Sequence, residues 1–161
     1  RDDWEAPMGD RNRLFISYSH KDTKWLTAVT EQLKVLETEG LVSLCEDSQL
    51  EVGEDWYQQL NDLMSSARLG LLLVSATFLT SKFVLKDEVP RLIERHGEGG
   101  MKIYPLLVEP CPWKRVAWLA RLQLRPQDAN RETRALSTFR GASRKQKIVD
   151  VADEIASLVK P

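Results

Sequence analysis

Two adjacent carboxylates, Asp87 and Glu88, follow soon after a strongly apolar segment of the chain. That segment, residues 69–75, reads LGLLLVS and is apolar at both alternating positions, which is typical of a strand covered on both faces. Pro90 fits best in the first turn of a helix, so Glu88 is expected at or just before a helix start. A carboxylate there can stabilise a developing positive charge. The alternative interpretation is a solvated acid favoured by the helix N-terminus.

A second group of polar side chains follows an earlier apolar segment. Residues 13–19 read RLFISYS, which predicts a strand with a polar exit at Ser17, Tyr18 and Ser19. These side chains could line a crevice beyond the strand end. Because alternate residues of a strand point inward, the alternative is that Ser17 or Tyr18 only packs.

The elements that must position these residues alternate between strand and helix along the chain. Further strands are predicted at 41–45 and 101–109, with a possible edge strand at 122–124. Helices are predicted over 22–40, from Glu54, in a third region that ends near 94–100, and over 143–159, with Asp22 as an N-cap and Gly40 as a stop. This alternation predicts a doubly wound α/β fold, a parallel sheet of about five strands in an order such as 2-1-3-4-5 with helices on both faces. A site is then expected beyond the carboxyl ends of strands one and three, where the strand order reverses.

The predicted core follows from the spacing of apolar residues. The first helix should bury one face and the last helix another, and the central strands should be covered on both sides. Expected to be buried are Trp25, Leu26, Val29, Leu33, Leu36, Leu71, Leu73, Ile103, Leu106, Ile148, Val151, Ile155 and Leu158. Trp113 and Trp118 are expected to pack under the irregular region that follows the fourth strand.

Length and composition indicate one globular domain. The chain has 161 residues, of which 42% are apolar and 29% charged, and its formal net charge is −1. This charge gives no reason to expect a nucleic acid or an anionic membrane as a partner, and the basic segment 140–147 is expected to be a solvated loop leading into a helix. Residues 1–12 are expected to be a linker or tag remnant, with the domain spanning 13–161.

The cysteines and the missing motifs narrow the chemistry. Cys45 and Cys111 are expected to be buried free thiols of a reducing compartment, which indicates a cytoplasmic protein. The chain contains no GxGxxG, GxxxxGK[ST], GxSxG or HExxH motif. With two histidines and no Cys/His cluster, no metal site is expected.

Four segments carry a family resemblance when they are taken in order. They read RLFISYSHKD, EDSQLEVGEDWYQQLNDLMSSAR, GLLLVSATFLTSKFVLKDEVPRLIERH and IYPLLVEPCPW. They resemble the successive signatures of a TIR (Toll/interleukin-1 receptor) domain, and bacterial members most of all. The resemblance covers residues 13–159 and implies a flavodoxin-like fold.

The resemblance implies two classes of function. Some TIR domains are adaptors that act only through self-association with other TIR domains. Others, including many bacterial ones, are NAD+ nucleosidases that cleave the nicotinamide–ribose bond and give nicotinamide with ADP-ribose or a cyclic isomer. For this chain the resemblance favours the enzyme, activated by self-association in a bacterial defence system, with NAD+ as substrate and no cofactor. A third possibility, an FMN-binding flavodoxin-like domain, would need a phosphate-binding glycine that SYSHKD lacks.

The resemblance also assigns residues. Enzymes of the family place a catalytic glutamate shortly after the third strand, usually four residues past an aromatic, often a tryptophan. Here Phe83 is the nearest aromatic, Asp87 follows at four residues and Glu88 at five. Glu88 is preferred because it opens the run EVPRLIERH, which resembles bacterial members, and Asp87 stays open as the alternative.

The substrate-binding residues implied by the resemblance come from three segments. Ser17, Tyr18 and Ser19 would line the nucleotide pocket, and Phe83 would stack on the substrate. The segment with Asp47 and Leu50 matches the BB loop, which shapes the pocket and contacts neighbouring copies; the alternative is an ordinary connection.

A lone glutamate suits this chemistry. Most glycosidases need two carboxylates, because an alcohol leaving group must be protonated. Nicotinamide leaves from a pyridinium cation and needs no proton. One carboxylate that stabilises the oxocarbenium charge is therefore sufficient.

Overall fold

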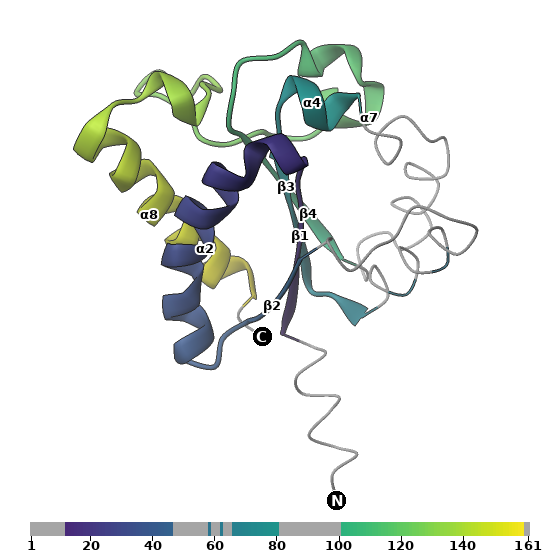
Figure 1. Ribbon diagram of the computed structural model, residues 1–161, viewed down its shortest axis with the longest axis vertical. Coiled ribbons are helices and arrows are strands. Elements are labelled where there is room, and N and C mark those ends of the chain that lie inside the picture. The colour runs from purple at the N-terminus through teal and green to yellow at the C-terminus, as the bar shows by residue number, and fades with distance from the viewer. Residues whose placement is uncertain (1–11, 47–57, 59–61, 63–65, 81–100, 160–161) are drawn as a thin grey trace, which may run out of the picture.

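Four parallel strands form the centre of the molecule (Figure 1). The computed structural model describes residues 12–46, 58, 62, 66–80 and 101–159. The strands are β1 (Arg13–Ser17), β2 (Ser43–Glu46), β3 (Leu69–Val74) and β4 (Lys102–Leu107), in the order β2-β1-β3-β4. This confirms the predicted α/β class and the reversal of strand order between the first and third strands, and it agrees with a flavodoxin-like fold.

The fifth strand is a correction, because the sheet has four strands in the described part of the chain. The segment expected to pair as an edge strand, 122–124, is followed by a single parallel bridge between Arg125 and Leu106. After Arg125 the chain turns into a local antiparallel bridge between Gln127 and Thr133, in which the N–H of Arg134 donates to Pro126 and the N–H of Asp128 donates to Glu132. Pairing with β4 therefore extends no further than one residue.

Helices pack on both faces of the sheet (Figure 1). The long helices α2 (Thr23–Thr38) and α8 (Gly141–Val159) lie side by side on one face. The short helices α4 (Ala76–Leu79) and α7 (Ala117–Ala120) contribute Phe78, Leu79 and Leu119 to a second apolar cluster on the other face.

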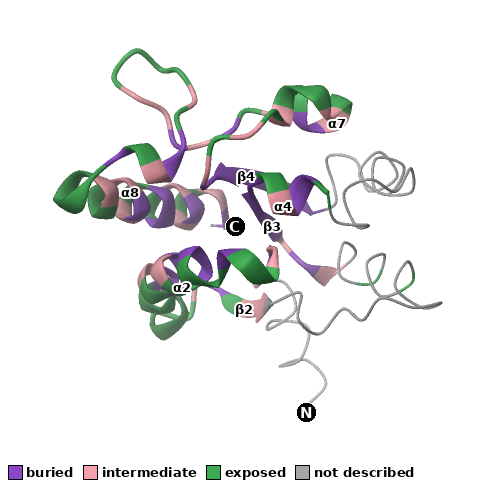
Figure 2. Cartoon of the chain, turned by 45° about the horizontal axis from the view of Figure 1, so that its top comes forward, coloured by how far each residue is buried: buried purple, intermediate pink, exposed green. Residues whose placement is uncertain are grey.

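The helix α2 confirms the predicted apolar spacing. Its inward face buries the five residues named from the sequence, Trp25, Leu26, Val29, Leu33 and Leu36, and Figure 2 shows that its outer face is exposed. Gly40 has φ +78°, and the N–H of Leu41 donates to the carbonyl of Leu36 at 3.0 Å, so the helix ends as predicted. The start differs, because a short 3-10 helix, η1 (His20–Asp22), precedes α2 and the Asp22 side chain makes no capping bond.

The strand β3 is buried at all six positions, as its unbroken apolar sequence predicts. Leu71, Leu73 and Leu106 are fully buried. Ile103 is only partly buried, because it lies near the start of β4, which is the edge of the described sheet.

The C-terminal helix and the irregular region show smaller differences. In α8, Ile148, Val151 and Ile155 are buried as predicted, whereas Leu158 is partly buried and Val159 takes the buried position. Trp113, in the 3-10 helix η3 (Trp113–Arg115), and Trp118 both pack against the second apolar cluster. The 3-10 helix η4 (Leu136–Thr138) precedes α8, and the segment 140–147, which was predicted to be a loop, is helical from Gly141 onward.

The two cysteines also differ from the prediction of buried thiols. Cys45 and Cys111 are both free, but each is only partly buried. Cys45 lies on β2, the edge strand at the other side of the described sheet, and Cys111 lies in the loop after β4. Neither position has packing on all sides.

Candidate functional site

The exits of β1 and β3 meet at the carboxyl edge of the sheet, where a site was predicted. The two strands pair directly, with Ser17 opposite Leu72. The chain leaves β1 through Tyr18 and Ser19 into η1, and it leaves β3 through Ser75 into α4. Figure 1 shows the turn after β1 and helix α4 at the same end of the sheet.

The three residues predicted at the exit of β1 have different environments. Ser17 is buried, with 1% of its surface exposed. Tyr18 is half-buried against the apolar cluster between the sheet and helices α2 and α8. Its ring lies edge-on to the ring of His20, with 6.4 Å between the ring centres. Ser19 is the N-cap of η1, and its Oγ accepts from the N–H of Lys21 at 3.4 Å. Of the three residues, Tyr18 and Ser19 are therefore partly exposed, whereas Ser17 is buried.

The other predicted site residues lie outside the described residues. These are Asp47, Leu50, Phe83, Asp87 and Glu88. Their roles stay predictions from the sequence and the resemblance.

The structure adds one residue that the sequence analysis had interpreted as a helix cap. Asp22 is only 5% exposed, and its carboxylate accepts hydrogen bonds from the hydroxyls of Ser75 and, at 3.4 Å, Thr77. Ser75 is 3% exposed, and its Oγ also accepts from the N–H of Phe78 at 3.1 Å. The carboxylate thus joins the exits of the two strands between which the site was predicted. The sequence contained one sign of this contact: a carboxylate, Asp22, soon after the first strand and two hydroxyls, Ser75 and Thr77, directly after the third.

A second tertiary link lies at the exit of β4. The indole N–H of Trp25 donates to Glu109 at 2.9 Å, and the ammonium of Lys24 lies 3.8 Å from the same carboxylate oxygen. The guanidinium of Arg144 lies over the Trp25 ring, 5.1 Å from its centre. The hydrogen bond from Trp25 to Glu109 thus joins α2 to the segment after β4, and the contact with Arg144 joins α2 to α8.

The thiol of Cys111, in the loop after β4, is a poor candidate for nucleophilic chemistry. Burial raises the pKa of Cys111 above its ordinary value, which disfavours the thiolate. Among the described residues, no group of three His, Cys, Asp or Glu side chains could hold a metal ion.

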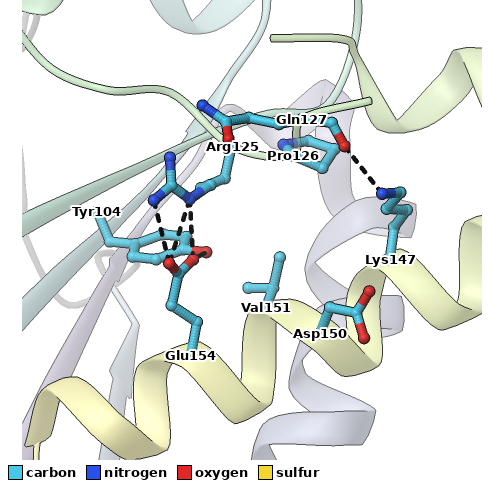
Figure 3. Close-up of a pocket in the computed structure, with 8 residues that line it drawn as sticks. All are labelled: Tyr104, Arg125, Pro126, Gln127, Lys147, Asp150, Val151 and Glu154. Carbon is cyan, nitrogen blue, oxygen red and sulfur yellow. Dashed lines mark hydrogen bonds and ion pairs between the residues drawn. The ribbon is translucent and has the colours of Figure 1, made fainter. Parts of the chain in front are cut away.

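A pocket of about 290 Å³ lies on another part of the molecule, between β4 and α8 (Figure 3). Tyr104, Arg125 and Glu154 line it. Arg125 Nε, at 3.0 Å, and the Tyr104 hydroxyl, at 2.5 Å, both donate to the same Glu154 oxygen. The hydrogen bond from Arg125 lowers the pKa of Glu154, and burial together with Glu154 raises the pKa of Tyr104. Both shifts move these groups away from titration near neutral pH. The cluster is suited to holding α8 against the sheet, and it contains none of the predicted site residues.

Two comparisons with known proteins follow from the sequence. Residues 14–139 match the model of the family described as TIR domain. The chain is also similar to the uncharacterized protein y4lF of Sinorhizobium fredii, strain NBRC 101917 / NGR234, with 30% identity over 115 residues. That alignment covers 71% of this chain and 35% of the relative, so the chain spans about a third of the relative's length. Among the described helices, none has the length and apolar character needed to cross a membrane.

Proposed function

Because the chain belongs to the TIR domain family, we propose that it is an NAD+ nucleosidase that cleaves the nicotinamide–ribose bond. The observation that supports this most is the meeting of the β1 and β3 exits at the carboxyl edge. In open α/β sheets a ligand binds at such a reversal of strand order. The candidate residues Tyr18 and Ser19 lie at this reversal, and Glu88 follows β3 in the sequence.

The proposed reaction needs one anionic group. The bond between ribose C1′ and the nicotinamide nitrogen breaks with its electron pair going to the ring, which leaves as neutral nicotinamide. The carboxylate of Glu88 stabilises the positive charge that develops on the ribose. Water then attacks C1′ and loses a proton to solvent, which gives ADP-ribose; an intramolecular nucleophile in place of water gives a cyclic isomer.

The described residues would have supporting roles in this reaction. Tyr18 and Ser19, which follow directly after β1, would line the nucleotide pocket. Ser17 is buried, which favours its packing role over direct contact with substrate. Phe83 would stack on the nicotinamide or adenine ring, and the segment with Asp47 and Leu50 would shape the pocket and contact a neighbouring copy.

A second candidate function is a scaffold that acts only by TIR–TIR assembly. The observation that favours it is Phe83, which stands where enzymes of the family often have a tryptophan. A bacterial defence setting and activation by self-association are proposed from the family alone.

Incubation of concentrated protein with NAD+ separates the two candidates. Nicotinamide and ADP-ribose are followed by liquid chromatography, with protein-free NAD+ as the blank. The enzyme releases nicotinamide in proportion to time and then reaches completion. If NAD+ is unchanged while light scattering shows that the protein has assembled, the nucleosidase proposal is wrong and the scaffold is supported.

A further inference from the structure

Asp22 is a buried carboxylate whose partners lie far away in the sequence. A buried carboxylate must be hydrogen-bonded or paired, because it has lost its water. In the described part of the chain its side chain forms no ion pair with lysine or arginine, and its partners are the hydroxyls of Ser75 and Thr77. These two hydroxyls begin α4, whereas Asp22 ends η1.

The hydrogen bonds hold the Asp22 carboxylate and the Ser75 hydroxyl in one orientation. Both hydroxyls donate to the same oxygen of Asp22, Oδ2, and they also lie 3.1 Å from each other. The Ser75 Oγ is in addition the acceptor for the N–H of Phe78, the capping bond of α4. Rotation of the Ser75 side chain would break bonds on two sides.

The carboxylate is not needed where the sequence predicted it to act. Asp22 precedes α2, but its side chain makes no capping bond to that helix. The short helix α4 is different, because four residues are too few for a stable helix without tertiary contacts. The link to Asp22 is a directional contact of this kind.

We propose that Asp22 is a positioning residue of the candidate site: its carboxylate fastens the start of α4 to the exit of β1, at the edge of the sheet where the proposed substrate would bind. This inference rests on the proposed function, because the rate that it affects is that of NAD+ cleavage. A positioning residue acts on the rate of the chemical step, since a displacement of about 1 Å at the reacting centre can lower the rate roughly 10²-fold.

Two matched pairs of variants test the proposal. Ser75→Thr keeps the hydroxyl, and Ser75→Val has the same shape as threonine without it. Asp22→Asn keeps an acceptor for the Ser75 hydroxyl, and Asp22→Ala removes it. We expect Ser75→Val and Asp22→Ala to lower kcat for nicotinamide release at least tenfold with KM changed less than threefold. Each conservative partner should recover most of that loss.

The control is Thr30→Val, which removes a buried hydroxyl that donates to the carbonyl of Leu26 within α2. It reports the effect of losing a buried hydrogen bond away from the site, and kcat should stay within twofold of wild type. All rates are measured well below each variant's melting temperature. A wild-type kcat in both Asp22→Ala and Ser75→Val overturns the proposal, and so does an equal loss in the two members of each pair. If Asp22→Ala does not fold, the Ser75 pair decides.

Hydrogen exchange gives a readout that does not depend on activity. The amides of Phe78 and Leu79 both donate to Ser75, to its side chain and its carbonyl respectively. They should exchange at least tenfold faster in Asp22→Ala than in Asp22→Asn. If wild type releases no nicotinamide, the proposed function has failed, and this exchange still decides whether Asp22 fastens α4. Unchanged protection in Asp22→Ala refutes the fastening itself.

Discussion

Arg125 and Glu154 form a two-bond ion pair that joins the segment beside β4 to α8. Arg125 Nε lies 3.0 Å from one carboxylate oxygen, and Nη2 lies 3.1 Å from the other. The hydroxyl of Tyr104, which projects from β4, donates to the same carboxylate (Figure 3). One side chain of α8 thus binds two groups that lie on adjacent segments of the sheet edge.

Replacement of Glu154 by glutamine should lower the free energy of unfolding by about 0.5–1 kcal/mol. The amide still accepts a hydrogen bond, but the charge that strengthens the bonds from Arg125 is lost. The effect is small because the Glu154 side chain is 37% exposed, so water screens the pair. Urea denaturation followed by circular dichroism measures it. Asp153→Asn, an exposed change on the same helix, is the control and should have no measurable effect.

The contribution of Glu154 should depend on pH with a defined sign. The pKa of Glu154 in the folded protein is lowered by the hydrogen bond from Arg125, below the ordinary value of about 4.3 for glutamate. The stability that the carboxylate adds is therefore complete above that ordinary value and is lost as the pH falls through the folded-state pKa. The difference in unfolding free energy between wild type and Glu154→Gln should be constant from pH 7 to pH 6 and shrink below about pH 4. A difference that grows on acidification would contradict this assignment.

Assembly should control activity if one copy completes the site of another. Leu50 lies outside the described residues, and its role comes from the resemblance to the BB loop. Leu50→Asp places a charge in a contact that must lose water, so it should suppress assembly. Specific activity of wild type should rise with protein concentration, and that of the variant should stay low. Light scattering measured on the same samples links the two effects, and a specific activity of wild type that does not change with concentration would rule the idea out.

Local patterns predicted much of this fold, whereas the contacts between distant segments had to come from the structure. The unbroken apolar run of β3 predicts a strand covered on both faces. The apolar spacing of α2 predicts a helix with one buried face, and both are found. Asp22 was different, because a carboxylate before a helix fits a capping role equally well. Only the pairing of β1 with β3 brings it to Ser75. The edge strand at 122–124 failed for a similar reason, since the competing bridge between Gln127 and Thr133 cannot be read from apolar spacing.

The identity of the reacting acid is the most direct prediction from the sequence. Glu88 and Asp87 both lie outside the described residues. In the sequence, Asp87 follows Phe83 by four residues and Glu88 follows it by five. If Glu88 stabilises the oxocarbenium charge, Glu88→Gln keeps the shape of the side chain and removes the negative charge. Loss of a preorganised charge of this kind costs about 3–4 kcal/mol, or roughly 10²–10³ in rate. Initial rates of nicotinamide release at saturating NAD+ measure this loss.

Asp87→Asn is the matched control, because it removes the same charge from the neighbouring residue. We expect its rate of nicotinamide release to stay close to that of wild type. Thermal unfolding of both variants should change little, because a solvated carboxylate contributes little to stability. A loss of rate in Asp87→Asn alone would mean that the usual four-residue spacing from the aromatic holds here and that Asp87 is the reacting acid. Wild-type rates in both variants would remove this pair of carboxylates from the mechanism, and another group would have to stabilise the charge on the ribose.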